Sequence, residues 1–424
     1  MKTKCCDTGH VIIGHVLSQG EKEHVVTRLE TVLYCLKQNG IPCSVDEMPN
    51  IAVLGSGGGL RAMVALLGSV GALDKVDLLD SVMYLSGVSG STWCMSSLYK
   101  EHDWSTNLKD LTDGIAKRLV DGKVSFWRKY DKLMKYFGES DNFSLTHVWA
   151  VMFISGEVKE IGDGGVTWQE GYNTKDPYPI YTVIDQTCEH EQQYKDVWFE
   201  ITPHLSGYSH TGAFVDTKHL GSKFKAGSLT EPQSEMDRLY LQGLCGSALA
   251  DFRKDIEWII NWIINWILQH IFGISSVVCH SGDFGEAEVF KTSWILSERT
   301  ISKEDIIKHT LQLCEELLKR MSGIGWVILL VKIMELIKSW TWGTTNNFLY
   351  GMTDPCCSNL KTETRWYEDA GLLLNSPYFS VLREERKVDL IISLDFSDGD
   401  PFKLPAAPAA SFGAFPNCFL FPFS

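Results

Sequence analysis

Tyr84-Leu85-Ser86-Gly87-Val88-Ser89-Gly90-Ser91-Thr92-Trp93 is the stretch that decides the fold. An apolar run, residues 81–85, leads into this cluster of glycine and serine, and a segment with helical character follows over residues 93–99. The order predicts a strand, a sharp turn and a helix, with Ser89 at the turn. A serine nucleophile needs such a turn, because its Oγ must stand clear of the backbone near the N–H groups of a helix N-terminus. A plain loop is the alternative, since Ser91 stands where the usual elbow has a second glycine.

A second glycine-rich turn precedes the first. Residues 50–54 read as a buried strand that runs into Gly55-Ser56-Gly57-Gly58-Gly59-Leu60-Arg61, and a helical pattern follows over 62–73. Successive glycines before a helix leave backbone N–H groups free to converge on an anion. The loop is either a phosphate cradle for a nucleotide or an oxyanion hole formed by the N–H groups of Gly58 and Gly59. The serine turn after the next predicted strand favours the oxyanion hole, and two such units predict a parallel sheet with its site at the carboxyl ends of the strands.

Composition excludes several classes of protein. The chain has 424 residues, of which 44% are hydrophobic, so it can bury a large core. Its 39 basic and 53 acidic residues give a net charge of −14, which argues against a nucleic-acid partner. The 12 cysteines show no metal-ligand spacing, and reduced thiols in a cytosolic protein are expected. We therefore expect no secretory signal and no membrane-spanning helix, since no apolar stretch reaches the roughly 20 residues that span a bilayer.

Other segments frame these turns. Residues 21–39 have the apolar spacing of a helix, and 178–184 and 197–202 have the composition of strands. Residues 255–272 carry a tryptophan at every fourth position from Trp258 to Trp266 and are apolar over most of a helical circumference, which fits either a core helix or a lid that faces a membrane. Residues 324–342 are aliphatic but too short and charged to span a bilayer, though they could lie at its surface.

A third candidate residue is Asp369, in Tyr367-Glu368-Asp369-Ala370-Gly371. An aspartate at a turn is usually a cap or an Asx-turn. The last histidine of the chain is His309, so the order Ser, Asp, His of α/β-hydrolases cannot be completed after Asp369. If Asp369 acts with Ser89, it must itself be the general base. The remaining histidines are too loosely spaced for a zinc motif, and no metal is expected.

These three stretches together resemble the three signatures of the cytosolic phospholipase A2 (group IV) family, and its gamma branch most of all. Further matching segments lie in the same order along the chain: 199–203, 221–224, 342–350 and 388–397. The resemblance implies an α/β fold with a mixed central sheet, helices on both faces and a helical cap or lid, as in patatin-like and cytosolic phospholipase A2 catalytic domains. It covers residues 21–402 and implies a cap at residues 250–340 that contains the tryptophan-rich helix.

The resemblance also assigns roles to residues. It implies that Ser89 is the nucleophile that is acylated, that Asp369 is the base, and that Gly58 and Gly59 form the oxyanion hole. No cofactor and no metal is implied.

Two arginines match further positions of the family. The resemblance implies that Arg61 stabilises substrate phosphate or the local turn. It implies that Arg386 binds the head-group phosphate, with Arg383 as the alternative.

The ends of the chain depart from other family members. Residues 1–20 form an N-terminal segment, and residues 1–50 leave no room for a calcium-binding C2 module, so membrane docking is expected to be calcium-independent. Residues 403–424 form a divergent tail, rich in proline, alanine and phenylalanine, that reads as irregular and could leave part of the sheet edge uncovered.

The expected function is hydrolysis of acyl esters in phospholipids or lysophospholipids, with transacylation as a related activity. The expected location is the cytoplasm, with peripheral attachment to intracellular membranes. The alternative is a membrane-binding protein with weak or no catalysis, because the C-terminal part of the family domain is replaced by the tail.

Overall fold

In the computed structural model, the chain is divided into two compact units. The first consists of Met1–Ala248 together with Trp342–Ser424, and the second of Leu249–Thr341. The structure describes residues 9–168, 174–186, 197–247, 324–339, 342–353, 360–397 and 418–421. Helix α11 (Ile324–Ser339) is the described part of the second unit. Among the described residues, no helix combines the length and apolar composition that crossing a bilayer requires.

The first unit is built around a large sheet. Its strands, together with the β8–β9 hairpin, are β1 (Ile12–Ile13), β2 (Ile51–Gly55), β3 (Val82–Gly87), β4 (Tyr178–Asp185), β5 (Trp198–Ile201), β6 (Leu205–Tyr208), β7 (Ala213–Asp216), β8 (Lys223–Lys225), β9 (Ser228–Glu231), β10 (Thr344–Asn346), β11 (Thr364–Asp369), β12 (Leu390–Leu394) and β13 (Cys418–Phe421). Its helices are α1 (Gln19–Gln38), α2 (Gly59–Lys75), α3 (Gly90–Leu98), α4 (Leu108–Asp121), α5 (Phe126–Glu139), α6 (Leu145–Trp149), α7 (Ser155–Glu157), α8 (Arg238–Cys245) and α12 (Tyr378–Val381).

The sheet is mixed, as the family resemblance implied. Its 11 described strands include the path β1-β7-β6-β5-β4-β3-β2-β12-β13, while β11 pairs with β4 and β10 with β11. Along this path, neighbouring strands from β4 through β3, β2 and β12 to β13 pair in parallel. Neighbouring strands from β4 through β5, β6 and β7 to β1 pair antiparallel. Every residue of β2 and β3 is buried, which explains why these strands read as continuous apolar runs rather than alternating ones.

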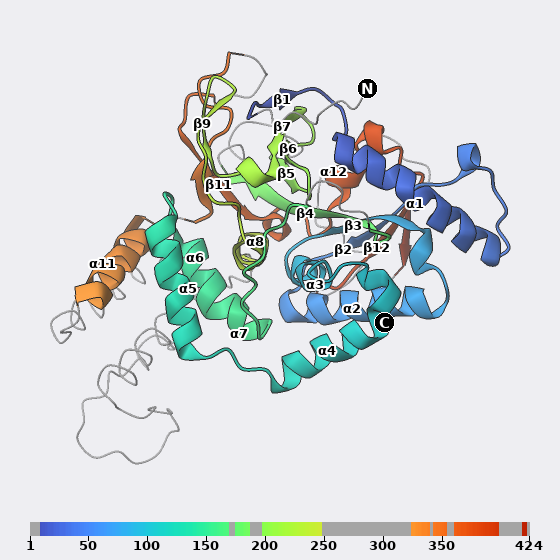
Figure 1. Cartoon of the computed structure of the whole chain (residues 1–424), viewed down its shortest axis with the longest axis horizontal. Coiled ribbons are helices and arrows are strands. Elements are labelled where there is room, and N and C mark those ends of the chain that lie inside the picture. The colour runs from blue at the N-terminus through green and yellow to red at the C-terminus, as the bar shows by residue number, and fades with distance from the viewer. Residues whose placement is uncertain are drawn as a thin grey trace, which may run out of the picture. The chain divides into compact units, whose positions relative to one another are not determined.

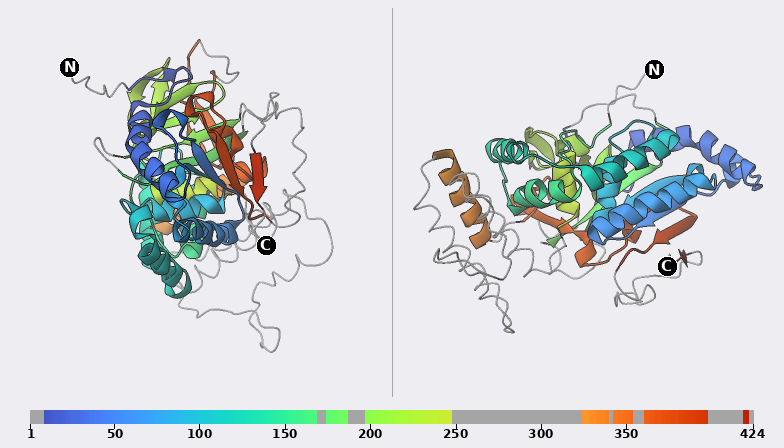
Figure 2. Two further views of the ribbon diagram at one scale, coloured as in Figure 1. Left: turned by 90° about the vertical axis from the view of Figure 1, so that its right-hand side faces the viewer. Right: turned by 90° about the horizontal axis from the view of Figure 1, so that it is seen from below.

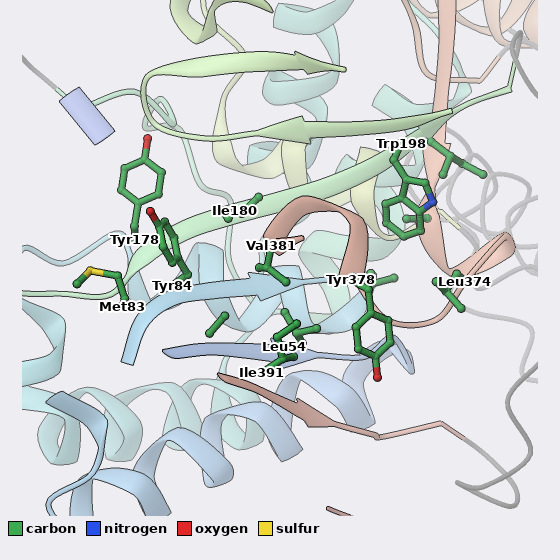
Figure 3. Close-up of a cluster of buried hydrophobic side chains, with 14 of the residues drawn as sticks. Leu54, Met83, Tyr84, Tyr178, Ile180, Trp198, Leu374, Tyr378, Val381 and Ile391 are labelled. Atoms are coloured by element: carbon green, nitrogen blue, oxygen red, sulfur yellow. The ribbon is translucent and has the colours of Figure 1, made fainter. Parts of the chain in front are cut away.

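Helices cover both faces of the parallel strands. In Figure 1, α1 and α12 lie on one side of β2, β3 and β12, and α2, α3 and α4 lie on the other. Seen from below, in the right panel of Figure 2, α2 lies in front of the strands. The core between α1, α12 and the sheet contains Val32, Leu54, Tyr84, Ile180 and Val381, and Figure 3 shows part of this cluster. The expected fold class is therefore confirmed.

The structure corrects the prediction for the C-terminal tail, and it does not describe several other segments for which predictions were made. Residues 403–424 were expected to be irregular, yet Cys418–Phe421 form β13, which pairs in parallel with Ile391–Leu394 and covers that edge of β12. The pattern failed there because proline and alanine around a short strand hide a four-residue apolar run. The tryptophan-rich helix at 255–272 and the rest of the expected cap up to 323 lie outside the described residues.

A buried histidine of α1, His24, and the half-buried His204 share two aromatic neighbours. His24 of α1 and His204 both contact the rings of Tyr178 and Trp168, with ring centroids 5.2 to 5.8 Å apart. Burial, helped by the charge of Arg28, lowers the pKa of His24 to about 3. Burial lowers the pKa of His204 to about 4. Both imidazoles are therefore neutral in the folded protein at neutral pH.

We expect the stability of the protein to fall as the pH drops below 6.5. In the unfolded chain both histidines bind a proton near pH 6.5, whereas in the folded chain they do so only near pH 3 to 4, so protons favour unfolding between these values. Each histidine should contribute a slope of about 1.4 kcal/mol per pH unit in the free energy of unfolding. Urea denaturation between pH 7 and 5 should show a smaller slope for His24→Phe. The exposed His15→Gln is the control, and an equal slope in wild type and His24→Phe would contradict this account.

Candidate active site

The two glycine-rich turns meet at the carboxyl ends of neighbouring strands. The last residues of β2 and β3 pair with each other in parallel. A Cβ added to Gly57 would lie 2.9 Å from the Cβ of Ser89, and one added to Gly90 would lie 1.9 Å from the carbonyl oxygen of Gly59. Side chains at these glycines would force the turns apart. The missing side chains therefore allow the glycine loop to lie directly against the serine turn.

Ser89 has a backbone conformation that non-glycine residues rarely adopt. It has φ 51° and ψ −123°, and it precedes the first residue of α3. Its carbonyl oxygen accepts hydrogen bonds from the N–H of Thr92 at 2.9 Å and from the hydroxyl of Thr92 at 2.5 Å. The neighbouring Ser91 hydroxyl donates to the carbonyl of Ser56 at 2.6 Å. Strained residues of this kind persist where surrounding contacts hold them, and they cluster at functional sites.

Gly58 and Gly59 place N–H groups beside this turn. Both have positive φ, 149° and 59°; Gly58 is the N-cap of α2 and Gly59 is its first residue. In the hydrogen bonds found among the described residues, the N–H groups of Ser56 and Gly57 have backbone acceptors, whereas no acceptor is bonded to those of Gly58 and Gly59. N–H groups in the first turn of a helix lack intrahelical partners, so they can bind an anion.

Asp369 ends strand β11, which pairs with the same edge of β4 as β3, the strand that leads to the serine turn. On one edge, β4 pairs with β5 across Tyr181–Ile184, so β3 and β11, which also pair with residues in this range, must lie on the other edge. There Gly87 is opposite Tyr181 and Asp369 is opposite Val183. Two residues along a strand correspond to about 7 Å. The end of β3 and the end of β11 therefore meet head to head, and the sheet brings the Ser89 turn and Asp369 together.

The carboxylate of Asp369 is fully buried. Its Oδ1 accepts a hydrogen bond from the N–H of Gly371 at 2.8 Å, and its own N–H donates to the Ser247 hydroxyl at 3.2 Å. Burial raises the pKa of the Cys245 thiol well above its ordinary value, and the charge of Asp369 raises it further. Cys245 therefore stays a neutral thiol beside the carboxylate.

Arg61 is exposed at the start of α2. Its Nε donates a hydrogen bond to the carbonyl oxygen of Phe396 at 2.9 Å, just beyond β12. This contact ties the glycine loop to the neighbouring strand, which agrees with a role in the local turn.

Arg386 lies in a different setting from the one that the resemblance implied. Its guanidinium is buried against α1 and β5, where Nε donates to Glu21 at 2.8 Å and both Nη atoms donate to Glu200 at 2.9 Å. Nη1 also donates to the carbonyl of Ser380. Because each guanidinium nitrogen faces an internal acceptor, we replace the expected phosphate contact with a structural role.

Arg383, the alternative, belongs to the same network. Its Nη1 donates to Glu200 at 2.7 Å, and its guanidinium lies over the ring of Phe214, 4.5 Å from the centroid. Burial raises the pKa of Glu200, but the charges of Arg386 and Arg383 outweigh burial and hold the pKa at about 2. Glu200 is therefore ionised between two arginines.

Sequence reasoning missed three residues. Glu200 had a visible signal, because it is a lone acid in the otherwise apolar β5, and such a residue needs a buried partner. Asn375 binds the backbone of Gly57, and Ser247 binds that of Asp369; neither had a signal beyond its place in a polar loop. Among the described residues, no group of three or more histidine, cysteine, aspartate or glutamate side chains could hold a metal ion.

We expect Arg386→Gln to lower the free energy of unfolding by about 3–5 kcal/mol, because it removes the arginine paired with the buried carboxylate of Glu21 and leaves Glu200 with Arg383 alone. Urea denaturation measures the loss. Arg61→Gln is the control, since an exposed arginine with one backbone hydrogen bond should change stability by less than about 1 kcal/mol. Equal effects of the two substitutions would argue against a structural role for Arg386.

Comparison with known proteins identifies relatives of this chain. Residues 51–257 match the family model described as the lysophospholipase catalytic domain. Human cytosolic phospholipase A2 gamma is 34% identical over 423 residues, which cover 91% of this chain and 75% of the relative. The mouse cytosolic phospholipase A2 gamma is 31% identical, over 93% of this chain and 74% of the relative.

Solved structures have the same fold. Human GIVD cytosolic phospholipase A2 has a TM-score of 0.65 and 22% identity, covering 94% of this chain and 53% of that chain. The same human protein in complex with methyl gamma-linolenyl fluorophosphonate has a TM-score of 0.62. The chain thus spans about half the length of these solved chains. The sequence identity to the gamma relatives and the shared fold show that the chain belongs to the cytosolic phospholipase A2 family of enzymes.

Proposed function

We propose that the protein hydrolyses acyl esters of phospholipids through a Ser89–Asp369 dyad and an acyl-serine intermediate. The observation that carries the proposal is the positive-φ turn at Ser89, packed against the glycine loop at Gly57 and Gly59. The buried Asp369, which the sheet brings to the same edge, supports it. The names of the relatives, cytosolic phospholipase A2 gamma, favour a phospholipid substrate.

The proposed reaction has two steps. In the first, Asp369 takes the proton of the Ser89 hydroxyl as Oγ attacks the ester carbonyl, and the N–H groups of Gly58 and Gly59 bind the negative oxygen that forms. Collapse of this intermediate breaks the ester bond, and the leaving alkoxide of the lysophospholipid receives the proton from Asp369. In the second step Asp369 takes a proton from water, the hydroxide attacks the acyl-serine, and the fatty acid leaves while Ser89 regains its proton.

The nucleotide-binding alternative for the glycine loop is less well supported. A phosphate cradle needs open space in front of the loop, whereas a Cβ at Gly57 or Gly90 would collide with the facing turn. A loop packed this closely on a serine suits an oxyanion that forms on the serine's own substrate.

The setting of the reaction follows from its substrate. We propose that the protein acts at a membrane surface as a peripheral protein of the cytoplasm, because phospholipid acyl chains lie within the bilayer. Arg61, which is exposed in the first turn of α2 just after the glycine loop, is available to contact substrate phosphate. Lysophospholipid is a second substrate class, favoured by the description of the matching family model.

We expect Ser89→Ala to lower fatty-acid release from phosphatidylcholine vesicles at least about a thousandfold, because it removes the nucleophile. A fluorophosphonate probe should label wild type at Ser89, since a probe of this class is named in the complex of a structural relative. Ser97→Ala changes a buried serine further along α3 and should leave release unchanged. Release that survives in Ser89→Ala would disprove the dyad, and vesicle binding without turnover in wild type would favour the membrane-binding alternative.

Removal of calcium should leave both activity and membrane binding unchanged. The proposed chemistry places the developing negative charge on backbone N–H groups and requires no metal ion. Fatty-acid release and co-sedimentation with vesicles, each measured with calcium and with a chelator, test this expectation. A loss of vesicle binding in the chelator would show that calcium-dependent docking exists.

A further inference from the structure

Asn375 connects the glycine loop to the aspartate turn. Its side-chain Oδ1 accepts a hydrogen bond from the N–H of Gly57 at 3.0 Å, and its side-chain Nδ2 donates to the carbonyl oxygen of Gly57 at 3.2 Å. Its backbone carbonyl also accepts from the N–H of Gly57 at 3.3 Å. One side chain therefore holds Gly57 by both its N–H and its C=O.

The same amide group lies beside the aspartate. A Cβ added to Gly371 would lie 3.0 Å from Oδ1 of Asp369 and 3.3 Å from Oδ1 of Asn375. The two oxygens are thus at most about 6 Å apart, a distance over which a charge at one affects the other. On its other side, a Cβ added to Gly57 would lie 2.4 Å from Oδ1 of Asn375 and 2.9 Å from the Cβ of Ser89. Asn375 therefore lies where all three parts of the candidate site meet.

We propose that Asn375 is a positioning residue for acyl transfer: it fixes the Gly57 peptide, and with it the N–H groups of Gly58 and Gly59, relative to Ser89 and Asp369. This inference rests on the proposed hydrolase function.

The chemistry of the side chain supports this role. Holding one residue by both its N–H and its C=O requires a group with a donor and an acceptor side by side, and the planar amide of asparagine provides both. An aspartate would still accept from the N–H of Gly57 but would repel its carbonyl oxygen. Oxyanion donors must be held to within about 0.5 Å of the position from which they bind the developing charge, so a loosened loop should slow the chemical step more than it weakens substrate binding.

The other end of β2 provides a matched control. The side chain of Asn50, just before β2, donates to the backbone carbonyls of Arg386 and Lys387, both at 3.1 Å. Asn50→Ala therefore removes the same kind of contact from the same strand, at the end away from Ser89. It should lower thermal stability and leave the turnover number unchanged.

The experiment compares wild type, Asn375→Ala, Asn375→Asp and Asn50→Ala on phosphatidylcholine vesicles. For Asn375→Ala we expect kcat to fall about 100-fold with KM within a few-fold of wild type, and labelling of Ser89 by the fluorophosphonate to slow in parallel. For Asn375→Asp, the added negative charge near Asp369 should move the acidic limb of the kcat/KM profile to higher pH by about one unit.

The possible results distinguish a failure of the proposed hydrolase function from a failure of the positioning role of Asn375. If wild type releases no fatty acid and Ser89 is not labelled, the proposed function fails, and the inference with it. If wild type is active but Asn375→Ala changes only stability, as Asn50→Ala does, then Asn375 is merely structural and the inference is overturned. If Asn375→Ala does not fold, Asn375→Asp decides, because aspartate repels the carbonyl oxygen of Gly57. A kcat and a rate of Ser89 labelling equal to those of wild type overturn the inference, and a lowered kcat with KM unchanged supports it.

Discussion

The contact between two turns, one after β2 and one after β3, is the constraint on which the candidate site depends. Parallel pairing aligns the ends of these strands, so the glycine loop and the serine turn emerge side by side. They can touch only because Gly57 and Gly90 carry no side chains, since a Cβ at Gly90 would lie 1.9 Å from the carbonyl oxygen of Gly59. This contact explains the glycine content of both motifs better than backbone freedom alone, since only two of the three glycines of the loop have positive φ.

The position of Asp369 follows from a second constraint, the shared edge of β4. Because β3 ends halfway along that edge, β11 can enter from the opposite direction and end where β3 ends. Two segments nearly three hundred residues apart in sequence are thereby joined through ordinary sheet pairing. The turn that follows Asp369 then contributes Asn375, which returns to hold Gly57. The sheet brings the Ser89 turn, the glycine loop and Asp369 close together, and we propose that the side-chain amide of Asn375 fixes their final spacing.

Local pattern was enough to predict strands β2 to β5 and the two glycine-rich turns, because apolar runs and glycine clusters report directly on burial and close approach. The mixed sheet was expected from the family resemblance, since the pattern alone predicted a parallel one. Pattern was not enough for Arg386. An arginine in a charged segment looks like a surface ligand, and only the fold reveals that Glu21 and Glu200 surround it. Asn375 was missed for a similar reason, since its partner Gly57 is more than three hundred residues earlier. The short strand β13 was hidden because its pairing with β12, rather than its own composition, creates it.

The stability of the Ser89 turn depends on the buried ion network around Glu200. A positive φ at Ser89 costs of order 1–3 kcal/mol, and it persists only if the neighbouring structure does not yield. Hydrogen bonds from Thr92 and Ser91 hold the turn locally, but they are attached to strands whose other face carries α1. The ionised Glu200, held between Arg383 and Arg386, fastens β5 to the segment that precedes β12. Thus the buried ion network, although it does not touch the candidate site, helps to keep rigid the sheet on which the strained serine depends.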